Sequence, residues 1–176
     1  MRPLTFRRLR RLAVPALATC SFAVAAAPAS AAPPCTASAT SARTTTLCLI
    51  NAERVAHGAR PLKLEKRLSR AALRHSRDMV ANRYFAHESR SGAGFSARIA
   101  STGWMHGRSR WNVGENLAWG SGALATPRAI VRAWMHSAGH RHNILQPRFH
   151  VIGIGIGAGA PTGNGSGKTY TTDFGS

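Results

Sequence analysis

The chain has 176 residues, of which 44% are hydrophobic, and its 24 Lys+Arg against six Asp+Glu give a formal net charge of +18. The arginines are spread along the chain rather than gathered, which argues against a specific nucleic-acid-binding protein. Anionic polymers or lipids of a cell surface are more accessible partners for an exported cationic protein. The alternative is that the charge only keeps the protein soluble.

The first 31 residues predict a secretory signal peptide. A cluster of arginines lies between positions 7 and 11, an apolar run follows over Leu12–Ala27, and Ala29–Ala31 supplies a small-residue cleavage site. The apolar run is short for a membrane span, which needs about 20 residues, so we expect an exported protein that does not span a membrane. Cleavage after Ala31 would remove five arginines and leave a net charge of +13, on a chain of about one ordinary domain in size. We expect a monomer.

Two cysteines, Cys35 and Cys48, remain in the exported part. In an oxidising compartment they favour a disulfide that ties the N-terminal arm to the first helix. The alternative is a pair of free thiols in a reducing compartment. Residues 32–44 lack any periodic pattern and predict a disordered arm, so the folded domain is expected over residues 45–176.

Apolar residues recur at helical spacing in four segments and alternate in three others. The segments predict helices over about 47–58, 65–83, 95–101 and 126–139, and strands over about 111–119, 151–157 and 170–174. Glycines occupy one face of the strand Val151–Gly157, and glycine weakens a strand unless something packs closely against it. We therefore expect a helix on that face and a hairpin between the last two strands, in one α+β domain.

Glu115 is conspicuous because carboxylates are scarce and this one lies in an apolar-rich segment, Trp111–Trp119. A buried carboxylate needs a cation, a hydrogen-bond donor or a proton. His87 and His140 are the candidates on either side of it along the chain. The site hypothesis is therefore one glutamate between two histidines.

Several segments in this order resemble the CAP superfamily of cysteine-rich secretory, antigen 5 and pathogenesis-related proteins, and its bacterial secreted branch in particular. The matching segments are Leu49–Arg54, Leu68–Met79, Phe85–His87, Gly114–Leu117, Trp134–Leu145 and Val151–Gly155. The resemblance implies a three-layer α-β-α sandwich around a short antiparallel sheet. It also implies an open ligand-binding cleft where His87, Glu115 and His140 meet, and a divalent metal bound through the two histidines.

Many relatives have a second acidic residue after the tryptophan of the fourth helix, but residues 135–139 contain none. This departure weakens any hydrolytic assignment. His136 and His140 are four residues apart, a spacing that suits two ligands on one helical face, although Ser137 stands where a zincin would carry its glutamate. Asn143 either orients a ligand in the cleft or caps the end of that helix.

The sequence therefore predicts a secreted module that binds a divalent cation, with Zn²⁺ preferred, or another ligand of the cell envelope. Two imidazoles and a carboxylate can hold Zn²⁺ with a water in the open position. One alternative is a metal-dependent hydrolase acting on peptide or cell-wall bonds, and another is sterol or lipid binding. A further possibility is that Glu115 only fastens the helices to the sheet. Whether the chain is an enzyme is left open, since no catalytic nucleophile is visible.

Overall fold

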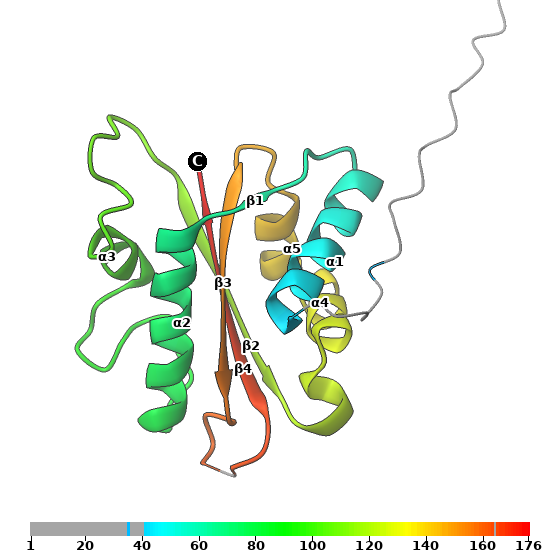
Figure 1. The fold of residues 1–176 in the computed structure, drawn as a ribbon, viewed down its shortest axis with the longest axis vertical. Coiled ribbons are helices and arrows are strands. Elements are labelled where there is room, and N and C mark those ends of the chain that lie inside the picture. Colours follow the sequence, from blue (N-terminus) through cyan, green and yellow to red (C-terminus); the bar gives the residue numbers. More distant parts are fainter. Residues whose placement is uncertain (1–34, 36–40, 164) are drawn as a thin grey trace, which may run out of the picture. The chain divides into compact units, whose positions relative to one another are not determined.

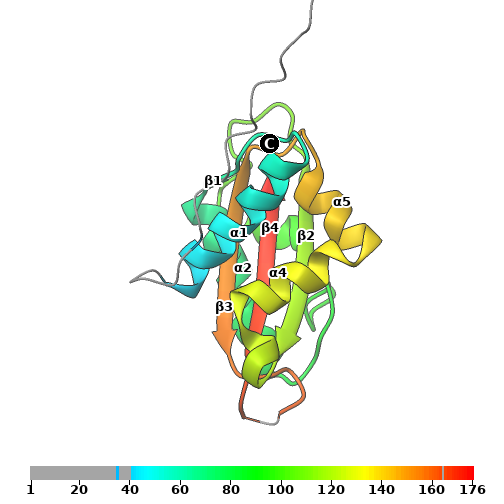
Figure 2. The same ribbon diagram turned by 90° about the vertical axis from the view of Figure 1, so that its right-hand side faces the viewer.

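A four-stranded sheet separates the helices into two layers, as Figures 1 and 2 show. The computed structural model describes residue 35 and residues 41–163 and 165–176, so the predicted signal peptide and most of the predicted arm lie outside it. The sheet has the order β1-β3-β4-β2, and its strands are β1 (Lys63–Leu64), β3 (Val151–Ala158), β4 (Lys168–Gly175) and β2 (Val113–Gly120). The predicted hairpin between β3 and β4 is confirmed.

One layer of helices contains α2 (Lys66–Ala81) and α3 (Phe95–Ala100), and the other contains α1 (Ala42–Ala56), α4 (Pro127–Met135) and α5 (Ala138–Leu145). A short 3₁₀ turn, η1 (Gly122–Ala125), follows β2. The expected three-layer α+β sandwich is confirmed. The sheet is mixed rather than purely antiparallel, because β1 pairs parallel with β3. A strand of two residues is too short to leave an alternating pattern in the sequence.

The two faces of the sheet are packed differently. A Cβ added to Gly153 would lie 2.1 Å from the carbonyl carbon of Leu68, and one added to Gly155 would lie 2.1 Å from the backbone nitrogen of Leu73. These glycines therefore let α2 lie against the strand, as the sequence predicted. The opposite face is apolar, and its buried cluster comprises Ile50, Leu62, Ile130, Val131, Trp134, Ile144, Phe149, Ile152, Ile154, Tyr170 and Phe174.

Helix α4 begins where predicted but ends earlier. The Thr126 side chain accepts a hydrogen bond from the backbone N–H of Ala129, and Pro127 occupies the first turn. The helix stops at Met135, since the N–H of His136 is shared between two carbonyls and Ser137 is extended. A separate helix, α5, then begins at Ala138 and includes Gly139. The expectation that His136 and His140 share one helical face is therefore wrong.

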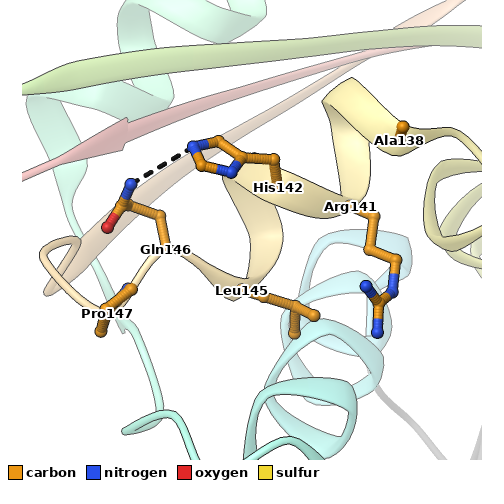
Figure 3. Close-up of a pocket in the computed structure, with 6 residues that line it drawn as sticks. All are labelled: Ala138, Arg141, His142, Leu145, Gln146 and Pro147. Atoms are coloured by element: carbon orange, nitrogen blue, oxygen red, sulfur yellow. Dashed lines mark hydrogen bonds between the residues drawn. The ribbon is translucent and has the colours of Figure 1, made fainter.

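Residues at the outer side of α5 line a hollow of about 350 Å³. Figure 3 shows His142 directed toward Gln146 and Arg141 directed toward α1. The Nε2 atom of His142 lies 3.3 Å from the Gln146 amide nitrogen. His142 is thus turned to a different neighbour from His140, although both belong to α5.

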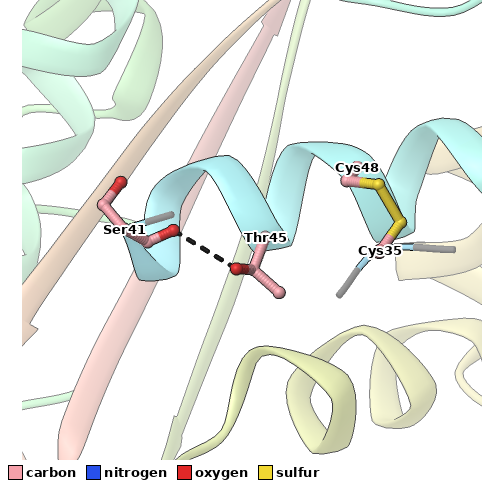
Figure 4. Close-up of a disulfide and its surroundings, with 4 residues drawn as sticks. All are labelled: Cys35, Ser41, Thr45 and Cys48. Atoms are coloured by element: carbon pink, nitrogen blue, oxygen red, sulfur yellow. Dashed lines mark hydrogen bonds between the residues drawn. A yellow bond between two sulfur atoms is a disulfide. The ribbon is translucent and has the colours of Figure 1, made fainter. Parts of the chain in front are cut away.

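Helix α1 begins at Ala42, so the predicted domain boundary at residue 45 falls inside its first turn. Ser41 caps the helix, because its side-chain oxygen accepts a hydrogen bond from the N–H of Thr44. The Thr45 hydroxyl also bonds to the Ser41 carbonyl (Figure 4). A Ser/Thr-rich segment that resembles a linker therefore starts a helix. The predicted disulfide between Cys35 and Cys48 is present and fastens residue 35 to α1.

A buried arginine joins α1 to the end of α5. Arg54 is 0% exposed, and burial lowers the pKa of its guanidinium. It donates hydrogen bonds to the backbone carbonyls of Arg60, Ile144, Gln146 and Phe149. The bonds to Ile144 and Gln146 satisfy carbonyls that the C-terminal end of α5 leaves without partners, and so they fix the position of α5.

Candidate functional site

Glu115 lies on the edge strand β2 with its carboxylate held by two partners. Its side chain is 1% exposed; Oε1 lies 2.8 Å from His87 Nδ1, and Oε2 accepts a hydrogen bond of 2.6 Å from Arg98. Of the two histidines that the sequence offered as partners, His87 is the one that lies against the Glu115 carboxylate. With a guanidinium on one oxygen and an imidazole on the other, the carboxylate is held in one orientation.

Arg98 was not singled out from the sequence, yet it organises the loop that carries His87. Besides Glu115, its guanidinium donates to the carbonyls of His87 at 2.7 Å and Ala93 at 3.1 Å, and to the Ser89 hydroxyl at 3.3 Å. Arg98 differs from the other basic residues only in its position on α3, where it faces β2. This position depends on how α3 packs against the sheet, so the sequence alone does not identify Arg98 as a site residue.

His87 is the exposed member of the site. Its side chain is 48% exposed, and its hydrogen bond to Glu115 raises the pKa of its imidazole. Nδ1–H donates to Glu115, and Nε2 makes no hydrogen bond within the described residues. Behind it, the buried ring of His75 bonds through Nε2 to the carbonyl of Ala86 at 2.9 Å. His75 therefore fixes the backbone immediately before His87.

His140 and Asn143 approach β2 from α5, on the other side of the sheet from α2 and α3. Nδ1 of His140 lies 2.9 Å from the Ser137 hydroxyl, and burial, followed by the nearby charge of His87, lowers the pKa of the His140 ring. Asn143 donates to the Glu115 carbonyl at 3.1 Å and to Asn116 Oδ1 at 2.9 Å. Asn143 therefore fastens α5 to β2, and of the two roles considered for it, that of a helix cap is wrong.

Asn116 completes the connection between the two sides. It is 0% exposed and donates to the carbonyl of His140 at 3.0 Å. Neighbouring residues of β2 thus point to opposite faces, as strand geometry requires: Glu115 toward His87 and Asn116 toward His140. The structure joins His87 directly to Glu115, and it joins His140 and Asn143 to the same strand through Asn116 and the Glu115 carbonyl.

A second acidic residue, Asp173, lies beside Glu115. It pairs in register with Glu115 across β4 and β2, and it is 1% exposed. Burial raises the pKa of Asp173 well above its ordinary value, and the charge of Glu115 and a hydrogen bond to it act in the same direction. The raised pKa favours the protonated form of Asp173, and the Oδ1 atom of this residue has no hydrogen-bond partner within the described residues.

The sequence prediction looked for a second acid only beside Trp134. The structure supplies one from β4 instead, but both Asp173 and the Glu115 side chain are shielded from solvent. Neither carboxyl group is therefore open to solvent, in contrast to the exposed His87.

The histidines retain nitrogen atoms suited to a cation. In both His87 and His140 the Nδ1 atom is engaged by an oxygen partner, and Nε2 makes no hydrogen bond among the described residues. Metal-bound histidines commonly have their other ring nitrogen held in this way. Among residues 35, 41–163 and 165–176, no group of three or more His, Cys, Asp and Glu side chains is arranged to hold a metal ion. The Glu115 carboxylate is the residue that orients the His87 ring.

Comparisons with known proteins agree with this architecture. The family model described as "Cysteine-rich secretory protein family" matches residues 47–174. The uncharacterized protein YkwD of Bacillus subtilis is 41% identical over 107 residues, which cover 60% of this chain and 38% of YkwD. This chain therefore spans well under half of that relative.

Two solved structures share the fold. An extracellular protein of Bacillus anthracis that contains an SCP domain has a TM-score of 0.61 and 27% identity, covering 74% of this chain and 39% of that one. An outer surface protein of Borrelia burgdorferi has a TM-score of 0.63 and 19% identity, covering 76% of this chain and 91% of that one. In the described part of this chain, no helix has the length and apolar character that crossing a membrane requires.

Proposed function

The chain belongs to the cysteine-rich secretory protein family, known as CAP, and from this premise we propose that it is an extracellular module that binds a divalent cation, preferably Zn²⁺, through His87 and His140. One observation carries the proposal: both imidazoles have Nδ1 engaged by an oxygen atom and Nε2 without a hydrogen bond in the described residues. Neutral imidazole is a preferred ligand of Zn²⁺. Extracellular placement is supported by the disulfide, by the signal-like N-terminus and by the two solved relatives, one an extracellular protein and the other an outer surface protein.

Glu115 acts in this proposal by positioning His87. Its carboxylate accepts the Nδ1 proton of His87, which fixes the tautomer that leaves Nε2 as the metal-binding atom. Arg98 occupies the other carboxylate oxygen and neutralises its charge. A cation held by only two protein ligands keeps open coordination positions, which an anionic group of an extracellular ligand can fill. The module would therefore bind its partner through the cation.

A zinc titration of residues 32–176 by calorimetry tests the proposal. We expect one equivalent to bind and His87→Ala and His140→Ala each to abolish binding. His142→Ala is the matched control, because His142 lies on α5 but turns toward Gln146, and it should leave affinity unchanged. Glu115→Gln should weaken binding by about 10- to 100-fold, the usual effect of removing a residue that orients a metal ligand. No binding, or equal losses in all three histidine variants, would overturn the proposal.

Hydrolysis of peptide or cell-wall bonds is a separate proposal that the same variants address. A pair of carboxyl groups whose surroundings differ is typical of acid–base enzymes, and Asp173, with its raised pKa, lies beside Glu115 in this way. Their burial argues against direct contact with a substrate, so binding is the better-supported function. Turnover of peptidoglycan or peptide that disappears in Glu115→Gln, with the fold intact by circular dichroism, would favour the hydrolase instead.

A further inference from the structure

The outer face of α2 carries a row of arginines that the candidate site does not use. Arg67, Arg70, Arg74 and Arg77 are all exposed and are separated by three or four residues. At 100° and 1.5 Å per residue, they occupy roughly 80° of the helix circumference and lie about 5 Å apart along the axis. We call these four residues the arginine ridge. In Figure 1 their helix lies next to the sheet, in the layer that it shares with α3.

The ridge has no carboxylate to neutralise it. The described residues form three ion pairs, none of which includes an arginine of the ridge. The nearest acidic residues are already engaged: Glu65 accepts the N–H of Leu68 as the helix cap, and Asp78 accepts hydrogen bonds from Asn82 and Tyr84. Like charges three and four residues apart destabilise a helix by about 0.2–0.5 kcal/mol per pair. The ridge is therefore a concentration of positive charge without an internal partner.

A hollow adjoins the N-terminal end of the ridge. Its volume is about 410 Å³, and its lining residues are Arg43, Leu64, Lys66, Ser69, Arg70 and Leu73. Three of these are cations. The Nε atom of Arg43 is buried and has no hydrogen-bond partner within the described residues, although buried donors are rarely left without one. This hollow thus offers an anionic group three positively charged side chains.

We infer that the arginine ridge and the hollow beside it bind a flexible phosphodiester polymer without bases, of the kind exposed on a cell envelope. Guanidinium groups bind phosphate through paired hydrogen bonds, and a row of them matches a partner whose phosphates recur along a chain. The choice of an envelope polymer rests on the extracellular placement in the proposed function. The binding surface itself is independent of the histidine site, because α2 turns the ridge away from β2.

Two other anionic partners fit the ridge less well. A membrane surface favours helices that insert bulky apolar residues beside their cations, whereas the ridge contains only arginines and Leu64 lies at one end of it. Single-stranded nucleic acid is held by aromatic side chains that stack on its bases. The large exposed aromatic residues, Phe85, Trp111 and Trp119, all lie outside α2.

The test measures binding of fluorescent poly(glycerol phosphate) to residues 32–176 by anisotropy, at low and moderate salt. The triple variant R70Q/R74Q/R77Q spares Arg67, which donates to the carbonyl of Gly103. We expect it to weaken binding on the order of 100-fold, at roughly fivefold for each cation near an anionic partner. The charge-matched control R128Q/R132Q/R148Q removes three exposed arginines from the other layer and the loop after α5, and it should change affinity by less than threefold.

Equal losses in the two triple variants would show that binding follows net charge alone and would overturn the inference. Tighter binding of the wild type to a single-stranded oligonucleotide, or to phosphatidylglycerol vesicles, than to poly(glycerol phosphate) of equal charge would also overturn it. Circular dichroism of each variant excludes misfolding. R70Q/R74Q/R77Q should bind zinc as the wild type does. The zinc titration therefore distinguishes a failure of the polymer-binding proposal from a failure of the metal-binding proposal.

Discussion

Replacing Asp173 with asparagine tests whether this buried carboxyl group carries a proton in the folded protein. The pKa of Asp173 is raised well above 3.8 by burial and by Glu115. Between 3.8 and the raised value, the folded state binds a proton that the unfolded state has lost. The stability contributed by this group therefore falls as pH rises through that interval, by about 1.4 kcal/mol per pH unit. The change Asp173→Asn should remove this dependence.

The asparagine amide is nearly the same size as the acid and can donate to Glu115 in its place. Urea denaturation at pH 5, 6, 7 and 8 gives the free energy of unfolding of both proteins. We expect the free energy of unfolding of Asp173→Asn to rise relative to that of the wild type as pH increases, with the slope given above. The rise should stop once the pH exceeds the pKa of Asp173 in the folded protein. Glu53→Gln is the control, because the Glu53 side chain is 40% exposed. A constant difference between Asp173→Asn and the wild type would show that Asp173 is ionised in the folded state and would refute the assignment of the proton.

Three further substitutions test how the fold supports the site. Arg98→Gln leaves Glu115 without its guanidinium partner and should lower the free energy of unfolding by about 3–5 kcal/mol in urea denaturation, the usual effect of breaking a buried ion pair. A loss below about 1 kcal/mol would show that the ion pair between Arg98 and Glu115 does not stabilise the fold. Gly155→Ala places a methyl group 2.1 Å from the backbone of α2 and should lower the free energy of unfolding by about 3 kcal/mol or more. Gly94→Ala is the control, because a Cβ added at Gly94 has no atom within 4 Å and should change stability little. The double variant Cys35→Ser/Cys48→Ser should lose about 3 kcal/mol, since the bridge closes a loop of sequence separation 13. If dithiothreitol lowers the stability of that variant as much as it lowers that of the wild type, the disulfide is not the cause.

The residues that the sequence identified are those whose local setting is unusual. Glu115 stands out because acids are few and its segment is apolar, and the structure gives it His87 as a partner. The glycines of β3 predict close helix packing for a similar reason, since a glycine-rich strand is unstable alone.

The residues that the sequence missed depend on tertiary register. Asp173 meets Glu115 only because β4 pairs with β2 in one register, which neither strand specifies alone. Arg98 is one basic residue among 24 and becomes special only when α3 packs beside β2. The break between α4 and α5 was misplaced because Gly139 looks like a stop, whereas the chain turns at His136 and Ser137.

Long-range ¹H–¹⁵N spectra of the histidine rings test the central claim most directly, because they report each ring nitrogen separately. On addition of one equivalent of Zn²⁺, we expect large shifts of Nε2 in His87 and His140, with Nδ1 of His87 still protonated toward Glu115. His142 should not respond. Shifts at Nδ1, shifts confined to histidines other than His87 and His140, or unchanged spectra would contradict a cation site built on these two residues.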